Sequence, residues 1–412
     1  MPGGSDRGAG VTTAAGVVVV GASAAGLSVA ETLRHDGFRE PITLVGEEDR
    51  LPYDRPPLSK ELLSGTWSED SLDLRDSAAI TALGLDVRLG VRAEAVDTAS
   101  RAVTLSDGSR VGYQDLVIAT GVRPRRMPGS DGIAGVHVLR TLGDARRLRS
   151  ELAGHRRLVI VGAGFLGAEV ASVACAAGAH VILVSDAEAP LSDVLGTKLG
   201  QLLVGVHAEH GVRVLTGTKV VGIATDGDRA TGVQLADGTA LPADLVLVSI
   251  GSLPNTEWLA GSGVPIGNGV VCDEYCRAAP GVWAAGDVAS WHHVGVDERI
   301  RIEHRTNASE QGMAVARNIV AGPDPTPFVP VPYIWSDQYD LKIQMYGLPR
   351  GADSFTVIDG SIGERKLVAI YGKNGRARAA VGINMFRSLR AARALVAEQA
   401  ELSSVINEEA SA

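Results

Sequence analysis

The chain has 412 residues and a formal net charge of −9, with 50 glycines and only 4 % aromatic residues. This length accommodates two or three domains, and the composition is typical of a globular α/β protein rich in tight turns. The acidic balance argues against nucleic acid as a partner, because a phosphate polyanion selects for basic surfaces. We expect residues 1–15 to form a flexible polar tail. No apolar segment resembles a signal peptide and no apolar run reaches membrane-spanning length, so we expect no association with a membrane. The three cysteines indicate no disulfide framework, which fits a reducing cytoplasm.

The first informative stretch is a strand, turn, helix and strand that ends at an acid. The β-branched run Val17–Val20 predicts a buried strand, and the small residues of Ala24–Arg34 predict a helix. A second strand, Ile42–Val45, precedes Glu47. The turn before the helix contains Gly21, Ser23 and Gly26. Such a turn directs backbone N–H groups at a pyrophosphate, and the acid accepts hydrogen bonds from a ribose diol, so an adenine dinucleotide is the expected ligand. The alternative, a helix packed on a strand without a ligand, is disfavoured by the terminal acid.

A basic loop stiffened by three prolines follows at Leu51–Lys60, LPYDRPPLSK. Its spacing alone supports two interpretations equally: the loop contacts the far end of an extended dinucleotide, or it is an ordinary surface loop. Weak strands at Leu85–Leu89 and Ala102–Leu105 predict an inserted meander. Asp115–Gly121, DLVIATG, predicts a buried strand that returns the chain to the first sheet and ends in a glycine turn.

A second unit of the same kind spans Arg157–Asp186. Strand Leu158–Val161 leads into a complete G-x-G-x-x-G and a helix carrying Glu169, and a strand Val181–Val184 follows. The three glycines are Gly162, Gly164 and Gly167. Two copies of one supersecondary unit are far more informative than one, and they predict two dinucleotides. The economical chemistry for two dinucleotides is hydride transfer between a nicotinamide and a flavin.

The charge after the second unit indicates which nicotinamide is bound. A 2′-phosphate requires a nearby arginine, whereas a free ribose diol requires an acid. No Arg or Lys lies between Asp186 and Thr197, while Asp186, Glu188 and Asp193 are acidic. NADH is therefore favoured over NADPH. The alternative is that Ser185 occupies the acid's position, with Asp186 one residue late.

Two later segments repeat the pattern of a short strand that ends in a glycine turn. Val246–Asn255 is expected to close the second domain, and Val282–Val288, VWAAGDV, places Asp287 at the tip of a third such turn. A carboxylate there can accept a hydrogen bond from a ribitol, and a helix at Ala308–Val320 should point its N-terminus at the same ligand. Taken alone, Asp287 fits a turn or helix N-cap equally well.

Several of these blocks together resemble one family. They are GASAAG with Glu47, YDRPPLSK, ATG-x-x-P, GAGFLGAE, AAGDV and WSDQ at Trp335–Gln338. In order and spacing they are similar to the FAD-dependent ferredoxin reductases of the putidaredoxin reductase kind, which share the glutathione reductase fold. The resemblance implies two Rossmann-like domains and a C-terminal α+β domain. The expected boundaries are 16–121 with 250–327 for the FAD domain, 122–249 for the NAD domain and 328–412 for the C-terminal domain.

The resemblance also implies roles for individual residues. Arg55 and Lys60 would lie by the FAD pyrophosphate and isoalloxazine, and Trp335 would approach the flavin. Glu169 would project near the nicotinamide and pair with Lys60, and we take these two as the catalytic pair. The expected FAD-binding residues are Gly21, Ser23, Ala24, Ala25, Gly26, Glu47, Arg55, Lys60, Ala119, Thr120, Gly121, Arg123, Gly286, Asp287 and Trp335. The expected NAD-binding residues are Gly162, Gly164, Phe165, Leu166, Gly167, Glu169, Asp186 and Gly251. No metal site is expected. One departure is Arg305, where a tryptophan is more usual.

The third domain is expected to contain strands at Lys342–Tyr346, Ser354–Ile358 and Leu367–Tyr371, followed by a helix near Leu389–Gln399. Lys373–Arg393 contains six basic residues and no Asp or Glu. Five arginines of this stretch form the expected partner patch, Arg376, Arg378, Arg387, Arg390 and Arg393. Such a patch could steer an acidic ferredoxin, and an ordinary solvated helix face with a polar turn is an equally good interpretation.

The function implied is electron transfer from NADH through FAD to an iron–sulfur ferredoxin that feeds a cytochrome P450 or another oxygenase, in a monomer or weak homodimer. The alternatives are a rubredoxin reductase and a non-enzymatic, NADH-responsive flavoprotein resembling apoptosis-inducing factor. The three cysteines are Cys175, Cys272 and Cys276. They form no C-x-x-C motif, and none lies in the PPLSK region. We expect all three to be buried apolar groups, which disfavours disulfide reductase and peroxidase chemistry.

Overall fold

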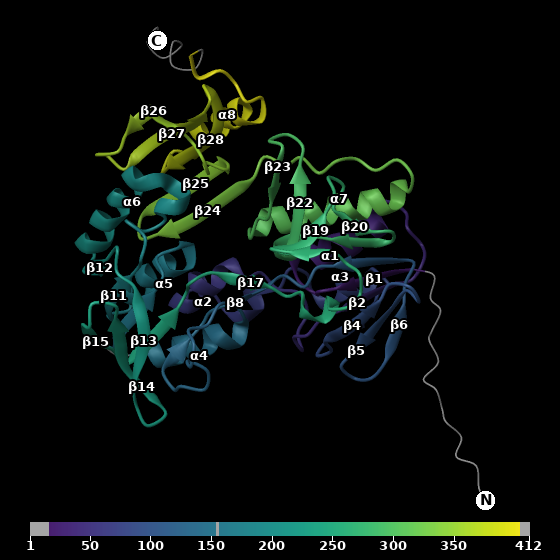
Figure 1. Ribbon diagram of the computed structural model, residues 1–412, viewed down its shortest axis with the longest axis horizontal. Coiled ribbons are helices and arrows are strands. Elements are labelled where there is room, and N and C mark those ends of the chain that lie inside the picture. Colours follow the sequence, from purple (N-terminus) through teal and green to yellow (C-terminus); the bar gives the residue numbers. More distant parts are fainter. Residues whose placement is uncertain (1–15, 154–155, 404–412) are drawn as a thin grey trace, which may run out of the picture. The chain divides into compact units, whose positions relative to one another are not determined.

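The computed structural model describes residues 16–153 and 156–403, and the expected N-terminal tail lies outside them. The chain divides into two compact units (Figure 1). The first contains the chain up to Asp54, Leu72–Arg123 and Leu253–Pro330, and the second contains Arg55–Ser71, Pro124–Ser252 and the chain from Val331. This division groups the C-terminal sheet and the PPLSK segment with the second nucleotide-binding sheet. The domain boundaries expected from the sequence stay a prediction.

The first unit is built on a six-stranded sheet in the order β20-β21-β7-β1-β2-β3. Its strands are β1 Val17–Val20, β2 Ile42–Val45, β3 Asp86–Arg88, β7 Asp115–Ile118, β20 Arg277–Ala279 and β21 Val282–Ala284. The central strand β1 pairs in parallel with β2 and β7, and all four of its residues are buried. Continuous β-branched runs suit this position, because both faces of a parallel sheet are covered. The helices α1 (Ala24–His35) and α7 (Arg305–Ala321) pack against each other.

The structure corrects two details of this unit. Strand β3 is not part of the expected meander, because it pairs in parallel with β2 at the edge of the main sheet. The meander is instead formed by β4 (Ala93–Asp97), β5 (Ala102–Leu105) and β6 (Arg110–Gly112). Helix α7 begins at Arg305, three residues before the expected start. A short four-stranded sheet completes the unit, from β18 Ile266–Gly267, β19 Gly269–Cys272, β22 Ala289–His293 and β23 Glu298–Ile300.

The second unit repeats the parallel architecture in a five-stranded sheet of order β12-β11-β10-β16-β9. Its strands are β9 Val136–His137, β10 Arg157–Val161, β11 His180–Val184, β12 Arg213–Leu215 and β16 Leu245–Val248, and its main helices are α4 Leu142–Leu152, α5 Phe165–Ala176 and α6 Ser192–Glu209. An antiparallel sheet is attached, formed by β13 Val220–Asp226, β14 Arg229–Leu235 and β15 Ala240–Pro242. Three further elements belong to the first unit, namely α3 Ser77–Ala82 and the 3₁₀ turns η3 Glu257–Leu259 and η4 Gly286–Val288. The other elements of the chain are α2 Glu61–Ser64, β8 Val122–Pro124, β17 Ser252–Pro254 and the 3₁₀ turns η1 Pro56–Ser59 and η2 Glu69–Leu72.

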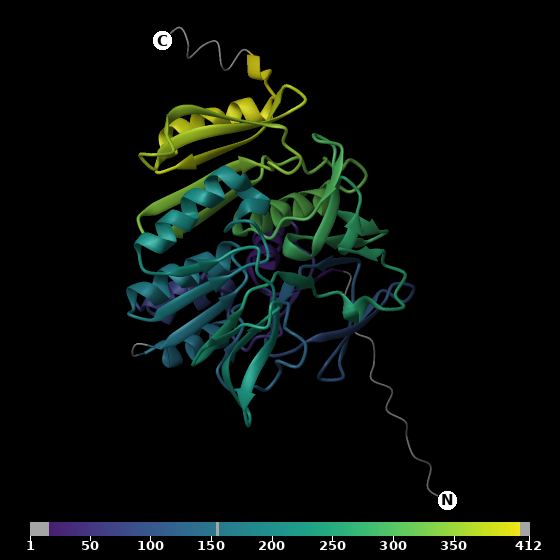
Figure 2. The same ribbon diagram turned by 60° about the vertical axis from the view of Figure 1, so that its left-hand side comes forward.

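The C-terminal sheet is antiparallel, in the order β24-β25-β28-β27-β26. Its strands are β24 Tyr333–Gln338, β25 Leu341–Gly347, β26 Ser354–Ser361, β27 Lys366–Lys373 and β28 Arg376–Ile383, and helix α8 spans Phe386–Ala397. Figure 2 shows α8 lying along one face of this sheet. Two of the strands, β24 and β28, are absent from the sequence-based prediction.

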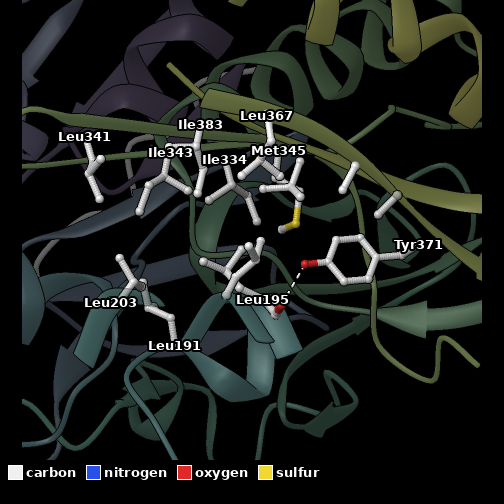
Figure 3. Packing of buried hydrophobic residues seen from close by; sticks show 14 of the residues in the cluster. Leu191, Leu195, Leu203, Ile334, Leu341, Ile343, Met345, Leu367, Tyr371 and Ile383 are labelled. Atoms are coloured by element: carbon white, nitrogen blue, oxygen red, sulfur yellow. Dashed lines mark hydrogen bonds between the residues drawn. The ribbon is translucent and has the colours of Figure 1, made fainter. Parts of the chain in front are cut away.

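The opposite face of the C-terminal sheet packs on α6 (Figure 3). Leu191, Leu195 and Leu203 meet an apolar surface formed by Ile334, Leu341, Ile343, Met345, Leu367 and Ile383. Tyr371 donates a hydrogen bond from its hydroxyl to the carbonyl of Leu195 at 2.6 Å. This core joins the C-terminal sheet to α6 within one unit. The expected fold class, two Rossmann-like sheets plus a C-terminal α+β domain, is confirmed.

Among the residues that the structure describes, we find no helix whose length and hydropathy would let it cross a membrane.

Candidate functional site

Each parallel sheet carries the same glycine turn at the end of its central strand. Gly21 (φ +123°) donates from its N–H to the Val45 carbonyl at 2.8 Å, and Gly162 (φ +104°) donates to the Val184 carbonyl at the same distance. A Cβ at Gly21 would lie 2.0 Å from the Ala119 oxygen, and one at Gly162 would lie 2.3 Å from the Ser249 oxygen. Only glycine fits either position, because of both the left-handed backbone and the close approach.

The helices that follow begin without a side-chain cap. Ser23 and Gly164 are the N-cap residues of α1 and α5, and neither makes a side-chain cap hydrogen bond. The N–H groups in the first turns of α1 and α5 are therefore free of a side-chain cap and can donate hydrogen bonds to an anion. At Gly164 a Cβ would meet no atom within 4 Å, so the turn is open there. Both turns fit a pyrophosphate.

The third glycine of each motif sets how closely helix and strand pack. A Cβ at Gly26 would lie 2.0 Å from the Gly21 carbonyl oxygen, and one at Gly167 would lie 2.1 Å from the Gly162 oxygen. The residues between them, Ala24 and Ala25 in one turn and Phe165 and Leu166 in the other, form the first turns of the two helices. The two motifs are therefore equivalent in backbone structure, although Ser23 replaces a glycine in the first.

The strand register shows which acids correspond in the two motifs. Val20 pairs with Val45, and Glu47 follows two residues later. Val161 pairs with Val184 in the same register, so Asp186 is the counterpart of Glu47. Both acids are exposed, whereas Ser185 is buried and its hydroxyl accepts a hydrogen bond from the Ala187 N–H at 3.2 Å. Ser185 is a turn residue here, and the exposed carboxylate equivalent in position to Glu47 belongs to Asp186.

The other predicted FAD residues of the first unit lie at the same end of its sheet. Ala119–Gly121 directly follow β7, and Gly286–Asp287 follow β21 after one residue; the two strands are parallel neighbours. Thr120 donates to the Asn255 carbonyl at 2.8 Å, and the Gly286 N–H donates to the Gln311 side chain at 2.9 Å. The carboxyl ends of adjacent parallel strands are the usual place for a nucleotide in such sheets. Arg123, by contrast, forms an exposed ion pair with Glu257 at 2.5 Å.

Helix α7 places two further residues beside this edge that the sequence analysis did not single out as ligands. His304 is its N-cap residue, and burial lowers the pKa of this imidazole to about 4 against the opposing effect of Asp287. His304 is thus neutral at pH 7. Arg305 donates from Nε to the Asp54 carboxylate at 2.6 Å and from Nη1 to the Ser309 hydroxyl. The unusual arginine is accommodated by an ion pair with the YDRPPLSK segment.

In the second unit, Glu169 is the centre of a buried polar cluster. Its Oε2 accepts from the Ser59 hydroxyl at 2.5 Å and from Lys60 Nζ at 3.1 Å, and its Oε1 accepts from the Ser336 hydroxyl at 2.8 Å. Glu169 is 6 % exposed, so the carboxylate depends on these donors in place of water. The pairing of Lys60 with Glu169 implied by the resemblance is therefore present, and the two serines are additional partners.

The remaining predicted residues of the second unit are more dispersed. Arg55 donates from Nη1 to the Arg140 carbonyl at 2.7 Å. Trp335 on β24 is half-buried and stacks on Tyr333, with ring centroids 5.9 Å apart. Gly251 accepts a hydrogen bond from the Arg125 N–H at 2.9 Å. The binding roles assigned to these residues stay predictions.

The five arginines of the partner patch divide between strand β28 and helix α8. Arg376 pairs with Glu401 at 3.4 Å, and Arg393 lies over the Tyr346 ring at 5.9 Å. Arg378 is half-buried on β28. Arg387 and Arg390 are exposed on α8, beside Phe386, which is 49 % exposed. The role of the five arginines as a partner patch stays a prediction.

The cysteines fit the expectation in two of three cases. Cys272 and Cys276 are buried, and burial raises the pKa of both thiols. Cys175 is only half-buried, because it lies on the last turn of α5, where its thiol donates to the His210 carbonyl at 2.8 Å. Burial raises its pKa as well. None is a reactive thiolate.

Comparisons with known proteins place these features in context. The model of the pyridine nucleotide-disulphide oxidoreductases matches residues 15–312, and that of the reductase C-terminal domain matches residues 333–410. Putidaredoxin reductase CamA of Pseudomonas putida is 37 % identical over 375 residues, which cover 89 % of this chain and 88 % of that protein. Rhodocoxin reductase of Rhodococcus erythropolis is 36 % identical over 391 residues, covering 94 % and 90 %. The structure of a covalent putidaredoxin reductase–putidaredoxin complex aligns with a TM-score of 0.90 and 34 % identity, covering 98 % of this chain and 99 % of that chain.

Proposed function

This chain belongs to the pyridine nucleotide-disulphide oxidoreductases, as a putidaredoxin reductase-like member with a reductase C-terminal domain, and from that premise we propose its electron donor, its acceptor and the residues that serve them. It is an FAD-dependent oxidoreductase that transfers electrons from a reduced nicotinamide dinucleotide to a ferredoxin. The observation that carries this conclusion is similarity over nearly the whole chain to ferredoxin reductases, combined with two equivalent nucleotide-binding turns.

We assign FAD to the first unit. The α1 N-terminus and the Gly21 turn would hold the pyrophosphate, Glu47 the adenosine ribose, and Asp287 the ribitol. These positions all follow strands of one parallel sheet at their carboxyl ends. When bound, FAD supplies the chemistry that accepts two electrons together and releases them singly. The protein's contribution is to bind, orient and shield this group.

We assign NADH, in preference to NADPH, to the second unit. The Gly162 turn and the N-terminus of α5 would hold its pyrophosphate, and Asp186 its adenosine ribose. Asp186 follows β11 at the position where Glu47 follows β2, and a carboxylate there accepts hydrogen bonds from a ribose diol but repels a 2′-phosphate. No Arg or Lys occurs between Asp186 and Thr197 to offset that repulsion.

The Lys60–Glu169 pair would act beside the nicotinamide end of this dinucleotide. Glu169 is the fifth residue of α5, one turn beyond the predicted pyrophosphate position. Its charge is balanced by Lys60 at 3.1 Å, with side chains that are 7 % and 11 % exposed. A buried, mutually neutralised pair offers both a donor and an acceptor without a net charge. The pair therefore suits the nicotinamide carboxamide, which carries one donor group and one acceptor.

For the acceptor, we propose that an acidic iron–sulfur ferredoxin of an oxygenase system docks on α8. Relatives include the reductase component of an anthranilate 1,2-dioxygenase system and putidaredoxin reductase, whose solved complex contains putidaredoxin. The support in this chain is Arg387 and Arg390, which are exposed on one helix in a protein of net charge −9. Opposite charges across such a surface raise the association rate.

Anaerobic titration of the purified, FAD-loaded protein with NADH and with NADPH tests the donor. We expect NADH to reduce the flavin at lower concentration and faster. The acceptor is tested by cytochrome c reduction with acidic ferredoxins added one at a time. A protein reduced by NADH that passes electrons to none of them would contradict the proposed acceptor and leave the donor assignment standing.

A further inference from the structure

Ser336 brings the C-terminal sheet into direct contact with the predicted catalytic carboxylate. It lies on β24 at an inward position between the buried residues Ile334 and Gln338. Its hydroxyl is 2.8 Å from Oε1 of Glu169, on α5, 167 residues earlier in the sequence. Ser336 is fully buried, and Glu169 is 6 % exposed. This hydrogen bond is therefore shielded from bulk solvent.

The direction of the hydrogen bonds follows from the groups present. The Gln338 amide nitrogen lies 3.2 Å from the Ser336 oxygen, and an amide NH₂ can only donate. The hydroxyl of Ser336 accepts this bond, and its single proton is directed at Glu169. The Gln338 nitrogen, the Ser336 hydroxyl and the Glu169 carboxylate thus form a chain of donors that ends on a charged acceptor.

The two carboxylate oxygens of Glu169 accept hydrogen bonds from different parts of the chain. Ser59 and Lys60 engage Oε2 from the loop at η1, at 2.5 and 3.1 Å. Among the described residues, Ser336 alone donates a hydrogen bond to Oε1, at 2.8 Å. A carboxylate fixed at one oxygen only can still turn about its terminal bond, because that torsion is broad. Fixing the second oxygen is what sets the plane of the group.

We propose that Ser336 is a positioning residue for hydride transfer, which acts through Glu169 and completes the nicotinamide site from the C-terminal sheet. This inference rests on the proposed role of the Lys60–Glu169 pair at the nicotinamide. Ser336 holds the carboxylate plane so that Oε2 faces Lys60 and the pair stays aligned. The C-terminal sheet then serves NADH as well as the acceptor, because one of its buried hydroxyls is part of the donor site.

The matched control is Ser172. It lies on α5 three residues after Glu169, and its hydroxyl accepts a hydrogen bond from the Tyr339 N–H at 2.8 Å. Ser172→Ala therefore removes one hydrogen bond between the same helix and the residue that follows β24, without touching the carboxylate. A purely structural role in seating β24 on α5 would make the two serines equivalent.

The experiment compares Ser336→Ala and Ser172→Ala as FAD-loaded proteins, by NAD⁺ binding to the oxidised form and by single-turnover flavin reduction with NADH. We expect Ser336→Ala to weaken NAD⁺ binding or to slow reduction by roughly tenfold or more, since hydrogen bonds to charged groups are the stronger ones. We expect Ser172→Ala to change either quantity by less than about twofold, and ferricyanide reduction by the prereduced protein to be unchanged in both. Equal effects of the two variants would overturn the proposal.

A double-mutant cycle with Glu169→Ala separates the inference from the function on which it rests. If Ser336 acts through Glu169, Ser336→Ala has no further effect once the carboxylate is gone. Additive losses would overturn the positioning role while leaving the role of Glu169 intact. A Glu169→Ala protein with unchanged NAD⁺ binding and flavin reduction would instead refute the proposed pair, and this inference with it. Should Ser336→Ala fail to retain FAD, Ser336→Cys, which keeps the volume and weakens the donor, is measured in its place with the same criteria.

Discussion

Reversing the charges of Arg387 and Arg390 tests whether α8 recognises the acceptor. Both side chains are exposed, and their positions are three residues apart on the helix, which separates them by about 4.5 Å along the axis. Arg387→Glu with Arg390→Glu changes the local charge by four units, two at each position. The variant alters no buried contact, because the inward face of α8 consists of Leu389, Ala392 and Val396.

The size of the effect follows from Coulomb's law. A partner carboxylate at roughly 10 Å interacts with each unit charge by about 0.4 kcal/mol in water, and by about 0.15 kcal/mol after screening at 0.1 M salt. Four units then cost about 0.6 kcal/mol for each facing carboxylate, or roughly a threefold change. Two facing carboxylates raise KM for the ferredoxin roughly eightfold. At 0.01 M salt the Debye length grows to about 30 Å, and the effect should roughly double in free energy.

The assay is NADH-dependent reduction of cytochrome c through the ferredoxin, with ferricyanide reduction as the measure of the NADH half-reaction. Arg213→Glu with Lys219→Glu is the control, because it makes the same change in net charge at exposed positions of the nucleotide-binding part of the second unit. We expect only the α8 variant to raise KM for the ferredoxin, with ferricyanide rates unchanged. Unaltered ferredoxin kinetics at both salt concentrations, or equal effects of the two variants, would refute the docking surface.

Three other changes are predicted. Asp186→Ala should raise KM for NADH about tenfold and reduce the preference for NADH over NADPH. Steady-state kinetics with both donors measure this preference as a ratio of kcat/KM values, and an unchanged ratio would contradict the assignment of Asp186 to the ribose. Arg305→Ala removes the ion pair with Asp54, which is 2.6 Å long and partly exposed, and should lower the thermal midpoint slightly, in line with about 1 kcal/mol or less. His207 is fully buried, and burial lowers the pKa of its imidazole to about 4. Below about pH 6.5 the imidazole of His207 takes up a proton in the unfolded chain but not in the folded one. The free energy of unfolding should therefore fall by about 3 kcal/mol as the pH is lowered from 6.5 to 4. His207→Gln should flatten that part of a pH–denaturation series, and an unchanged slope would show that His207 does not govern it.

The nucleotide-binding units could be predicted from sequence because their signals are local. A β-branched strand, a glycine turn and an acid lie within some thirty residues of one another in each copy. Asp186 and Glu47 each lie two residues after the last residue of their strand. The pairing of Val184 with Val161 and of Val45 with Val20 confirms that the two acids are equivalent in position. The same local pattern located the strands that precede Gly121 and Asp287.

The features that were missed depend on distant contacts or on residues without a strong pattern. Strand β28, RARAAVGI, consists mainly of small residues whose strand character comes from packing between β25 and β27. Strand β3 was assigned to a meander, since nothing local shows that its partner is β2. Ser59 and Ser336 reach Glu169 across 110 and 167 residues, so no spacing rule could identify them.

The arrangement around Glu169 also shows why a motif alone understates a site. GAGFLGAE identifies the carboxylate, and PPLSK identifies its lysine. The third donor, Ser336, comes from WSDQ, where the family resemblance implies a role for the tryptophan and none for the adjacent serine. Ser336 is buried and Trp335 half-buried, since alternate residues of a strand face opposite sides.

The most direct test of the whole account is anaerobic stopped-flow mixing of the FAD-loaded protein with NADH. We expect a yellow protein whose visible flavin absorbance bleaches rapidly with NADH and much more slowly with NADPH. A protein that takes up no flavin, or whose flavin NADH does not reduce, would contradict it.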